Sequence, residues 1–126
     1  MKALIISADN FEDSELLYPY YRLKEEGVEV DIASIKKGAI KGKHGYEVDA
    51  NKDLRGIHAA EYDLLLLPGG SAPEAIRKEK EATEIAKHFF VNNKPVSAIC
   101  HGPQTLITAG LFKAGMPPAI SQWPRR

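Results

Sequence analysis

Three short apolar runs, each followed by turn residues, constrain the fold of this chain most strongly. They are Ala3–Ile6, the four leucines that follow Asp63 in Asp63–Leu67, and Val96–Ile99. An uninterrupted apolar run of this length is typical of a strand that is covered on both faces of a parallel sheet. Because helical patterns separate the runs, the sequence predicts an α/β fold with right-handed crossovers.

Apolar residues at helical spacing predict two helices between the strands. The first presents Leu16, Tyr20 and Leu23 on one face, and the second presents Ala82, Ile85, Ala86 and Phe89. A turn and cap at Asp9–Asn10 would open the first helix and Gly27 would end it, while Asn92–Asn93 would end the second. Val28–Ala33 alternates like a strand, and the glycine-containing stretch 38–50 indicates a hairpin or an irregular excursion.

Length and composition predict one soluble domain and exclude several function classes. At 126 residues the chain can build one core, so we expect a single domain over residues 1–126. Seventeen basic residues balance seventeen acidic ones, which argues against nucleic-acid and membrane partners. The chain has no run near the roughly 18 apolar residues of a membrane span and no signal-peptide pattern. Its single cysteine forms no intrachain disulfide, so we expect a cytoplasmic protein.

In a parallel sheet, functional residues gather at the carboxyl ends of the strands. Three segments are predicted to meet at that edge, namely Asp9–Glu15, Pro68–Glu74 and Cys100–Gly102. Cys100 follows a buried strand, and Gly102–Pro103 opens a helical pattern, so the cysteine lies on a turn like a nucleophile elbow. The start of a helix favours the reactive thiolate. A free cysteine is also a common core residue, but the flanking His101 and glycine favour a nucleophile.

The other two segments offer groups that could assist such a thiolate. Glu12, Asp13 and Glu15 open the first helix, where acids complement its dipole. Glu15 follows the spacing of the apolar face, so its carboxyl group is predicted to point inward and to donate a proton or hydrogen bond to the sulfur. The backbone N–H groups at Gly69–Gly70, together with that of His101, could form an oxyanion hole.

The histidines leave one alternative open. His101 adjoins the cysteine and could act as a general base or serve a structural role. His44, His58 and His88 have no partners at ligand spacing, so we expect no metal site and no cofactor.

Together these segments resemble the DJ-1/PfpI superfamily, most closely its archaeal PfpI-type intracellular protease branch. The motifs that carry the resemblance are Asn10–Glu15, Tyr18–Tyr20, Arg22–Gly27, Gly42–Tyr46, Leu67–Gly70, Ala72–Glu74 and Ala98–Pro103. The resemblance runs from residue 1 to about residue 113. The family pattern normally continues beyond this point, whereas the proline-containing tail at 114–126 departs from it. We therefore expect a family domain that is shortened or altered at its C-terminal end.

The resemblance implies a flavodoxin-like three-layer sandwich with a mainly parallel sheet. It implies that Cys100 is the nucleophile, that Glu15 is hydrogen-bonded to it, and that the amides of Gly70 and His101 bind the oxyanion. His101 would be the base, with Glu74 of an adjoining subunit as its acid partner, so a homo-oligomer is expected. Gly69 and Glu12 would have secondary roles.

The function predicted from these features is that of a cysteine-dependent hydrolase that cleaves peptides through the Cys100 thiolate. One alternative is a deglycase or glyoxalase that removes glyoxal-type adducts from glycated proteins. Another, from a different class, is a non-catalytic redox sensor or chaperone-like stress protein, in which the cysteine is oxidised reversibly.

Overall fold

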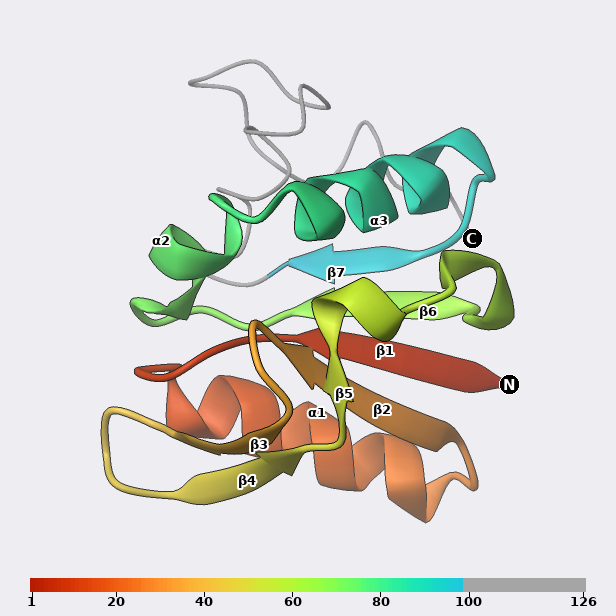
Figure 1. The fold of residues 1–126 in the computed structure, drawn as a ribbon. Helices are drawn as coiled ribbons and strands as arrows, with labels where there is room; N and C mark the ends of the chain where they lie inside the picture. The colour runs from red at the N-terminus through yellow and green to blue at the C-terminus, as the bar shows by residue number, and fades with distance from the viewer. Residues whose placement is uncertain (99–126) are drawn as a thin grey trace.

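A computed structural model of the chain describes residues 1–98, in which five parallel strands form one sheet (Figure 1). In chain order the strands and helices are β1 (Lys2–Ile6), α1 (Asp13–Glu25), β2 (Glu29–Ser34), β3 (Gly38–Lys41), β4 (Glu47–Ala50), β5 (Lys52–Asp53), β6 (Leu64–Leu67), α2 (Ala72–Ile76), α3 (Lys80–Val91) and β7 (Val96–Ala98). Two 3-10 turns, Leu54–Gly56 and Ala59–Glu61, connect β5 to β6. The helices of residues 1–98 include none with the length and apolar character of a membrane span.

The strand order of the sheet is β5-β2-β1-β6-β7. The chain therefore starts in the middle of the sheet, builds outward through β2, and returns to the other side of β1 with β6. In the register, Leu4 of β1 lies opposite Asp31 of β2 and Leu65 of β6. This reversal between β1 and β6 is the topological switch point of a flavodoxin-like sheet, where ligands bind beyond the carboxyl ends of the strands. The predicted fold class is confirmed.

The helices complete the layers of the predicted sandwich. The crossover from β1 to β2 contains α1, and the crossover from β6 to β7 contains α3. Crossovers between parallel strands are right-handed as a rule, and these two run in opposite directions from the switch point, which is the arrangement that places helices on opposite faces of a sheet. In Figure 1, α1 lies beside β2, and α3 lies beside β6 and β7.

The core forms where the predicted apolar runs meet the apolar faces of the helices. Ala3, Leu4 and Ile5 of β1 are fully buried, and so are Leu16 of α1 and Phe89 of α3. Burial on both faces explains why Ala3–Ile6 of β1 and the whole of β6 are apolar without alternation.

One polar network is buried beside this core. The hydroxyl of Tyr62 donates to Oδ2 of Asp31 at 2.6 Å, and the side-chain amide of Asn51 donates to Oδ1 at 2.8 Å. Oδ1 of Asn51 accepts from the backbone N–H of Ile32 at 2.8 Å, so the network ties the segment after β4 to β2. Lys2 lies 3.5 Å from the Asp31 carboxylate and adds a positive charge.

Residues 38–50 form the hairpin that was one of two alternatives from the sequence. β3 and β4 pair in antiparallel fashion, with Ile40 opposite Val48. Residues 42–46 connect the two strands, and we call this segment the hairpin loop. It docks on the start of α1, because Lys43 donates its backbone N–H to the carbonyl oxygen of Phe11 at 3.0 Å.

The start of the first helix differs from the prediction. Asp9 does not cap α1, because Oδ1 of Asp9 accepts from the backbone N–H of Lys41 at 2.9 Å and so ties the end of β1 to the hairpin. The helix begins at Asp13, with Glu12 in the N-cap position. The helix α2 was not predicted from the sequence, because a helix of five residues is too short to show a helical period.

Candidate functional site

The segments after β1 and β6 meet at the switch point of the sheet. Phe11 and Gly70 form an isolated antiparallel bridge. Glu12 donates its backbone N–H to the carbonyl oxygen of Gly69 at 3.1 Å, and Ser71 donates to the carbonyl oxygen of Asn10 at 2.9 Å. Two of the three segments predicted to share this edge therefore do so. The third, Cys100–Gly102, lies outside the described residues.

The bridge requires a glycine at position 70. Gly70 has a φ of +89°, which side-chain-bearing residues rarely adopt. A Cβ atom there would lie 2.5 Å from the backbone nitrogen of Glu12 and 2.6 Å from the carbonyl oxygen of Asn10. The hydrogen bonds of the bridge use the carbonyl of Gly69 and the N–H of Ser71, so they leave the N–H of Gly70 out of the pairing.

The Glu15 side chain reaches from the first turn of α1 to the loop after β6. Oε1 of Glu15 accepts a hydrogen bond from the backbone N–H of Gly69 at 2.9 Å, and Glu15 is half-buried. This agrees with the inward orientation predicted for Glu15. The bond also commits the N–H of Gly69 to Glu15, so Gly70 is the better candidate for an oxyanion donor of the two glycines. The predicted contact between Glu15 and Cys100 involves a residue outside the described part of the chain.

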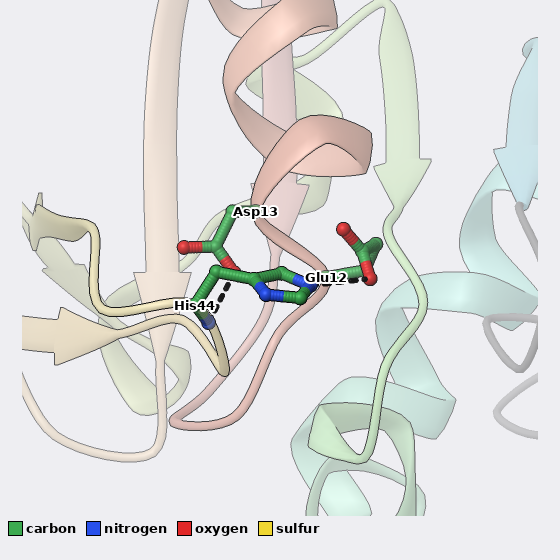
Figure 2. A group of neighbouring side chains, drawn as sticks. All are labelled: Glu12, Asp13 and His44. Carbon is green, nitrogen blue, oxygen red and sulfur yellow. Dashed lines mark hydrogen bonds and ion pairs between the residues drawn. The ribbon is translucent and has the colours of Figure 1, made fainter.

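Glu12 faces the hairpin loop instead of Gly69–Gly70. Its Oε2 lies 3.0 Å from Nζ of Lys43 and 3.6 Å from Nε2 of His44. Figure 2 shows the imidazole of His44 extending toward the Glu12 carboxylate. The hydrogen bond from Lys43 is the main reason that the pKa of Glu12 is lowered, although partial burial acts in the opposite direction.

Asp13 anchors the hairpin loop to α1. Oδ1 of Asp13 accepts from the backbone N–H of His44 at 2.9 Å, and Oδ2 accepts from that of Tyr46 at 3.0 Å. Burial alone would raise the pKa of this carboxyl group, which is only 4 % exposed, but the two backbone N–H groups outweigh burial and lower the pKa. A Cβ atom at Gly42 would lie 2.5 Å from the same carboxylate, so the loop approaches α1 as closely as a glycine allows.

Sequence reasoning did not find the roles of Asp13 and His44. Glu12, Asp13 and His44 offer ligand atoms that lie within 4.8 Å of one another (Figure 2), although no ligand spacing in the sequence indicates a metal site. In the structure the two carboxylates of this group already have protein partners. Asp13 accepts hydrogen bonds from two backbone amides, and Glu12 pairs with the ammonium group of Lys43. These contacts favour a loop-anchoring role for the cluster. Gly42 and Gly45 were the only features of the sequence that pointed to this arrangement. They predict a turn, but they do not show that the turn packs against α1.

The remaining predicted site residues are placed only in part. Glu74 lies on α2, is exposed, and has its Oε1 3.1 Å from the guanidinium of Arg77. Within residues 1–98 it therefore joins neither Glu12 nor Glu15. Cys100 and His101, the predicted nucleophile and base, lie outside the described residues.

Comparisons with known proteins find relatives that match most of this chain. The model of the DJ-1/PfpI family matches residues 1–116. "Deglycase PfpI" of Pyrococcus furiosus is 56% identical over 113 residues, which are 90% of this chain and 68% of that protein. "Putative cysteine protease YraA" of Bacillus subtilis is 40% identical over 113 residues, which are 89% of this chain and 67% of that protein.

Solved structures show the same fold. Oxidised DJ-1 of Toxoplasma gondii superposes with a TM-score of 0.80 at 29% identity, over 90% of this chain and 63% of that one. The chain thus spans about two thirds of the length of each of these three relatives.

Proposed function

The chain belongs to the DJ-1/PfpI family, and we propose that it is a cysteine-dependent deglycase that removes glyoxal-type adducts from protein amines. The observation that carries the proposal is the hydrogen bond from Gly69 to Glu15, which fixes a carboxyl group and a glycine loop at the switch point of the sheet. The name of the Pyrococcus furiosus relative, at 56% identity, supports a deglycase over the peptidase favoured by the motifs alone.

Chain connectivity supports Cys100 as the nucleophile. Ala98 of β7 lies opposite Leu67 of β6 in the register of the sheet. Gly69 follows Leu67 by two residues, and Cys100 follows Ala98 by two residues. Because two residues of chain span at most about 7 Å, this connectivity supports our assignment of Cys100 to the edge at which Gly69 meets Glu15.

The described contacts support a separate role for each residue around the thiolate. Glu15 uses Oε1 to accept from Gly69, and its second oxygen, Oε2, is the atom we assign to the sulfur of Cys100. The N–H of Gly70, which the bridge leaves out, would stabilise the developing oxyanion. His101 would transfer protons, and Glu74 of a second copy of the chain would orient it, which suits the exposed position of Glu74.

The proposed reaction balances without an external oxidant. In a glyoxal adduct, R–NH–CH(OH)–CHO, the thiolate attacks the aldehyde carbon and forms a C–S bond, and its oxygen becomes an alkoxide. The carbinol oxygen then forms a C=O bond as the C–N bond breaks, and its proton leaves with the amine. The alkoxide takes up a proton, and a hemithioacetal of glyoxal remains on the cysteine. Proton transfer between the two carbons oxidises the sulfur-bearing carbon to a thioester and reduces its neighbour to CH₂OH. Water cleaves the thioester, releasing glycolate and the thiol.

Peptide hydrolysis is the second candidate, because the Bacillus subtilis relative is named a putative cysteine protease. The same thiolate would attack a peptide carbonyl, release the amine, and leave an acyl-enzyme for water to hydrolyse. A redox sensor or chaperone would catalyse neither the removal of glyoxal adducts nor the hydrolysis of peptides.

The test is to incubate the protein with a lysine peptide that has been modified with glyoxal. We expect stoichiometric release of free amine and glycolate, measured by NMR, and no release by Cys100→Ser. Glu84→Gln, an exposed change on α3 at a carboxylate that lies 3.9 Å from Lys80 of the same helix, serves as the matched control and should behave as the unaltered protein. Cleavage of the peptide backbone without glycolate would favour the peptidase, and the absence of both products would contradict an enzymatic function.

A further inference from the structure

A proline lies at the centre of α1, where helices rarely tolerate one. Six residues of the 13-residue helix precede Pro19, and six follow it. A proline in a helix interior lacks the N–H that would donate to the carbonyl oxygen four residues earlier, and its ring collides with that carbonyl group. Since α1 continues through Pro19 to Glu25, the proline bends the helix and does not end it. Departures of this kind from local preference gather at functional sites.

The carbonyl group that faces Pro19 belongs to Glu15. Position 15 is four residues before position 19, so the backbone carbonyl of Glu15 receives no hydrogen bond from the residue that would ordinarily provide it. The proline ring pushes the same carbonyl group outward. Glu15 is also the residue whose Oε1 accepts from the backbone N–H of Gly69 at 2.9 Å. The disruption of the helix thus falls on the residue whose carboxyl group reaches the loop after β6.

Pro19 separates two parts of α1 that pack differently. Asp13 and Leu16, which are buried, lie in the first part. This part meets the loop after β6, because Glu12 at its start donates a backbone N–H to the carbonyl oxygen of Gly69 at 3.1 Å. The residues of the second part are half-buried or exposed, and this part lies beside β2 (Figure 1). A bend at Pro19 lets each part follow its own packing surface.

The connections at the two ends of α1 determine which part follows the bend. Three residues, 26–28, connect the end of α1 to β2, and the backbone N–H of Val28 donates to the carbonyl oxygen of Leu23 at 3.0 Å. Six residues, 7–12, connect β1 to the start of α1. Because the shorter connection holds the second part in place, a change at Pro19 moves chiefly the first part, which carries Glu15.

We propose that Pro19 is a positioning residue for the candidate active site, because its bend sets the direction in which α1 presents the Glu15 carboxyl group to Gly69. A residue with an N–H at position 19 would restore the helical hydrogen bond to the Glu15 carbonyl and turn the carboxyl group away from Gly69. The inference rests on the proposed deglycase function for its effect on turnover, whereas its effect on the Gly69–Glu15 hydrogen bond does not. Pro19 acts through Glu15 and takes no part in the chemistry itself.

The experiment supplies the missing N–H in two variants, Pro19→Ala and Pro19→Gly, which differ in helix propensity. Hydrogen exchange followed by NMR reports the Gly69 amide directly. We expect this amide to exchange about tenfold faster in both variants than in the unaltered protein, and to approach its rate in Glu15→Ala, which removes the acceptor. The amide of Ser71, which donates to the carbonyl oxygen of Asn10 at 2.9 Å, should keep its protection and is the internal control.

Turnover of the glyoxal-modified lysine peptide is the second measurement. In Pro19→Ala we expect kcat to fall by roughly tenfold to a hundredfold with KM nearly unchanged, because a misplaced carboxyl group affects the reacting geometry and leaves substrate binding intact. Adding Pro19→Ala to Glu15→Ala should cause little further loss, since both substitutions act on the same interaction. Glu84→Gln should retain the kcat of the unaltered protein.

Three outcomes would overturn the inference. An unchanged exchange rate of the Gly69 amide in both Pro19 variants would show that the proline does not position Glu15. Faster exchange of the Ser71 amide as well would assign Pro19 to the stability of the whole edge, and additive losses of kcat from Pro19→Ala and Glu15→Ala would show that it acts through another residue. If the unaltered protein releases no glycolate, the proposed function fails, and the Gly69 amide still decides the role of Pro19.

Discussion

The backbone N–H of Gly69 donates a 2.9 Å hydrogen bond to Oε1 of Glu15, across 54 positions of the sequence. The bond joins the first turn of α1 to the loop after β6, on the two sides of the switch point. It orients the Glu15 carboxyl group toward the loop after β6, and it occupies the N–H of Gly69, which leaves Gly70 as the candidate oxyanion donor of the two glycines. Five predictions test this arrangement, the docking of the hairpin loop on α1, and the buried polar network of Asp31.

Substitutions of Glu15 should separate the effect of its hydrogen-bonding group from the effects of its charge and its length. Glu15→Gln retains an oxygen for Gly69 and a donor for a sulfur, so it should keep more deglycase activity than Glu15→Asp or Glu15→Ala. Glu15→Ala leaves the N–H of Gly69 without this acceptor and should lower the free energy of unfolding by about 1–3 kcal/mol. Urea unfolding and glycolate release measure the two effects. An equal loss of activity in all three variants would make Glu15 purely structural.

Gly70→Ala should be much more damaging than Gly27→Ala, although both glycines have positive φ values of 89° and 79°. A Cβ atom at Gly27 meets no atom within 4 Å, so only backbone strain of about 1–2 kcal/mol is expected there. At Gly70 it also collides with the backbone of Glu12 and Asn10, so we expect a loss of about 2–5 kcal/mol. Thermal or urea unfolding of the matched pair measures the difference. Equal losses would contradict the close approach of the two loops.

Asp13 substitutions should release the hairpin loop. Asp13→Ala removes both acceptors, so the amides of His44 and Tyr46 should exchange hydrogen as fast as exposed loop amides. Asp13→Asn retains one acceptor oxygen and should protect only one of the two amides. Hydrogen exchange followed by NMR resolves them individually. Unchanged protection in Asp13→Ala would show that other contacts hold the loop.

The same carboxyl group predicts a pH dependence. The pKa of Asp13 is lower in the folded chain than its unfolded value of about 3.8–3.9. Its contribution to stability is therefore fully present above that unfolded pKa and is lost as the pH falls through the folded pKa. Protection of the His44 and Tyr46 amides should weaken in acid below about pH 4, and the Asp13→Asn variant should lack this transition.

Tyr62→Phe should destabilise the fold by about 1–3 kcal/mol, because Oδ2 of the buried Asp31 loses its donor. Burial, followed by the neighbouring Asp31 carboxylate, raises the pKa of Tyr62 well above its usual value of about 10. The stabilisation is thus complete below about pH 10 and is lost as the pH rises toward the folded pKa. Urea unfolding between neutral and alkaline pH measures it, and Tyr62→Phe should show a shallower alkaline slope. Parallel slopes would mean that the tyrosine contributes nothing to the pH dependence.

The sequence predicted best where local pattern and tertiary role coincide. β1, β6 and α3 follow directly from apolar runs and helical spacing, because burial on both faces of a sheet leaves no other pattern. Glu15 was also predicted to point inward, since its position relative to Leu16 sets its direction on the helix. The prediction that Asp9 caps α1 was wrong, because Asp9 instead accepts from the N–H of Lys41, which lies 32 positions away in the sequence.

The sequence by itself determined the order of β1, α1, β2, β6, α3 and β7, the sheet edge at which Glu15 and Gly69–Gly70 meet, and membership of the family, since each depends on residue types at short spacing. The tertiary structure alone decided that Asp13 binds the hairpin loop, that Glu12 pairs with Lys43, and that Gly69 is committed to Glu15. These contacts join segments that are about 30 to 54 positions apart. Their partners are selected by how the hairpin and the β6 loop dock on α1, and docking depends on shape and packing over the whole domain, which no local pattern records.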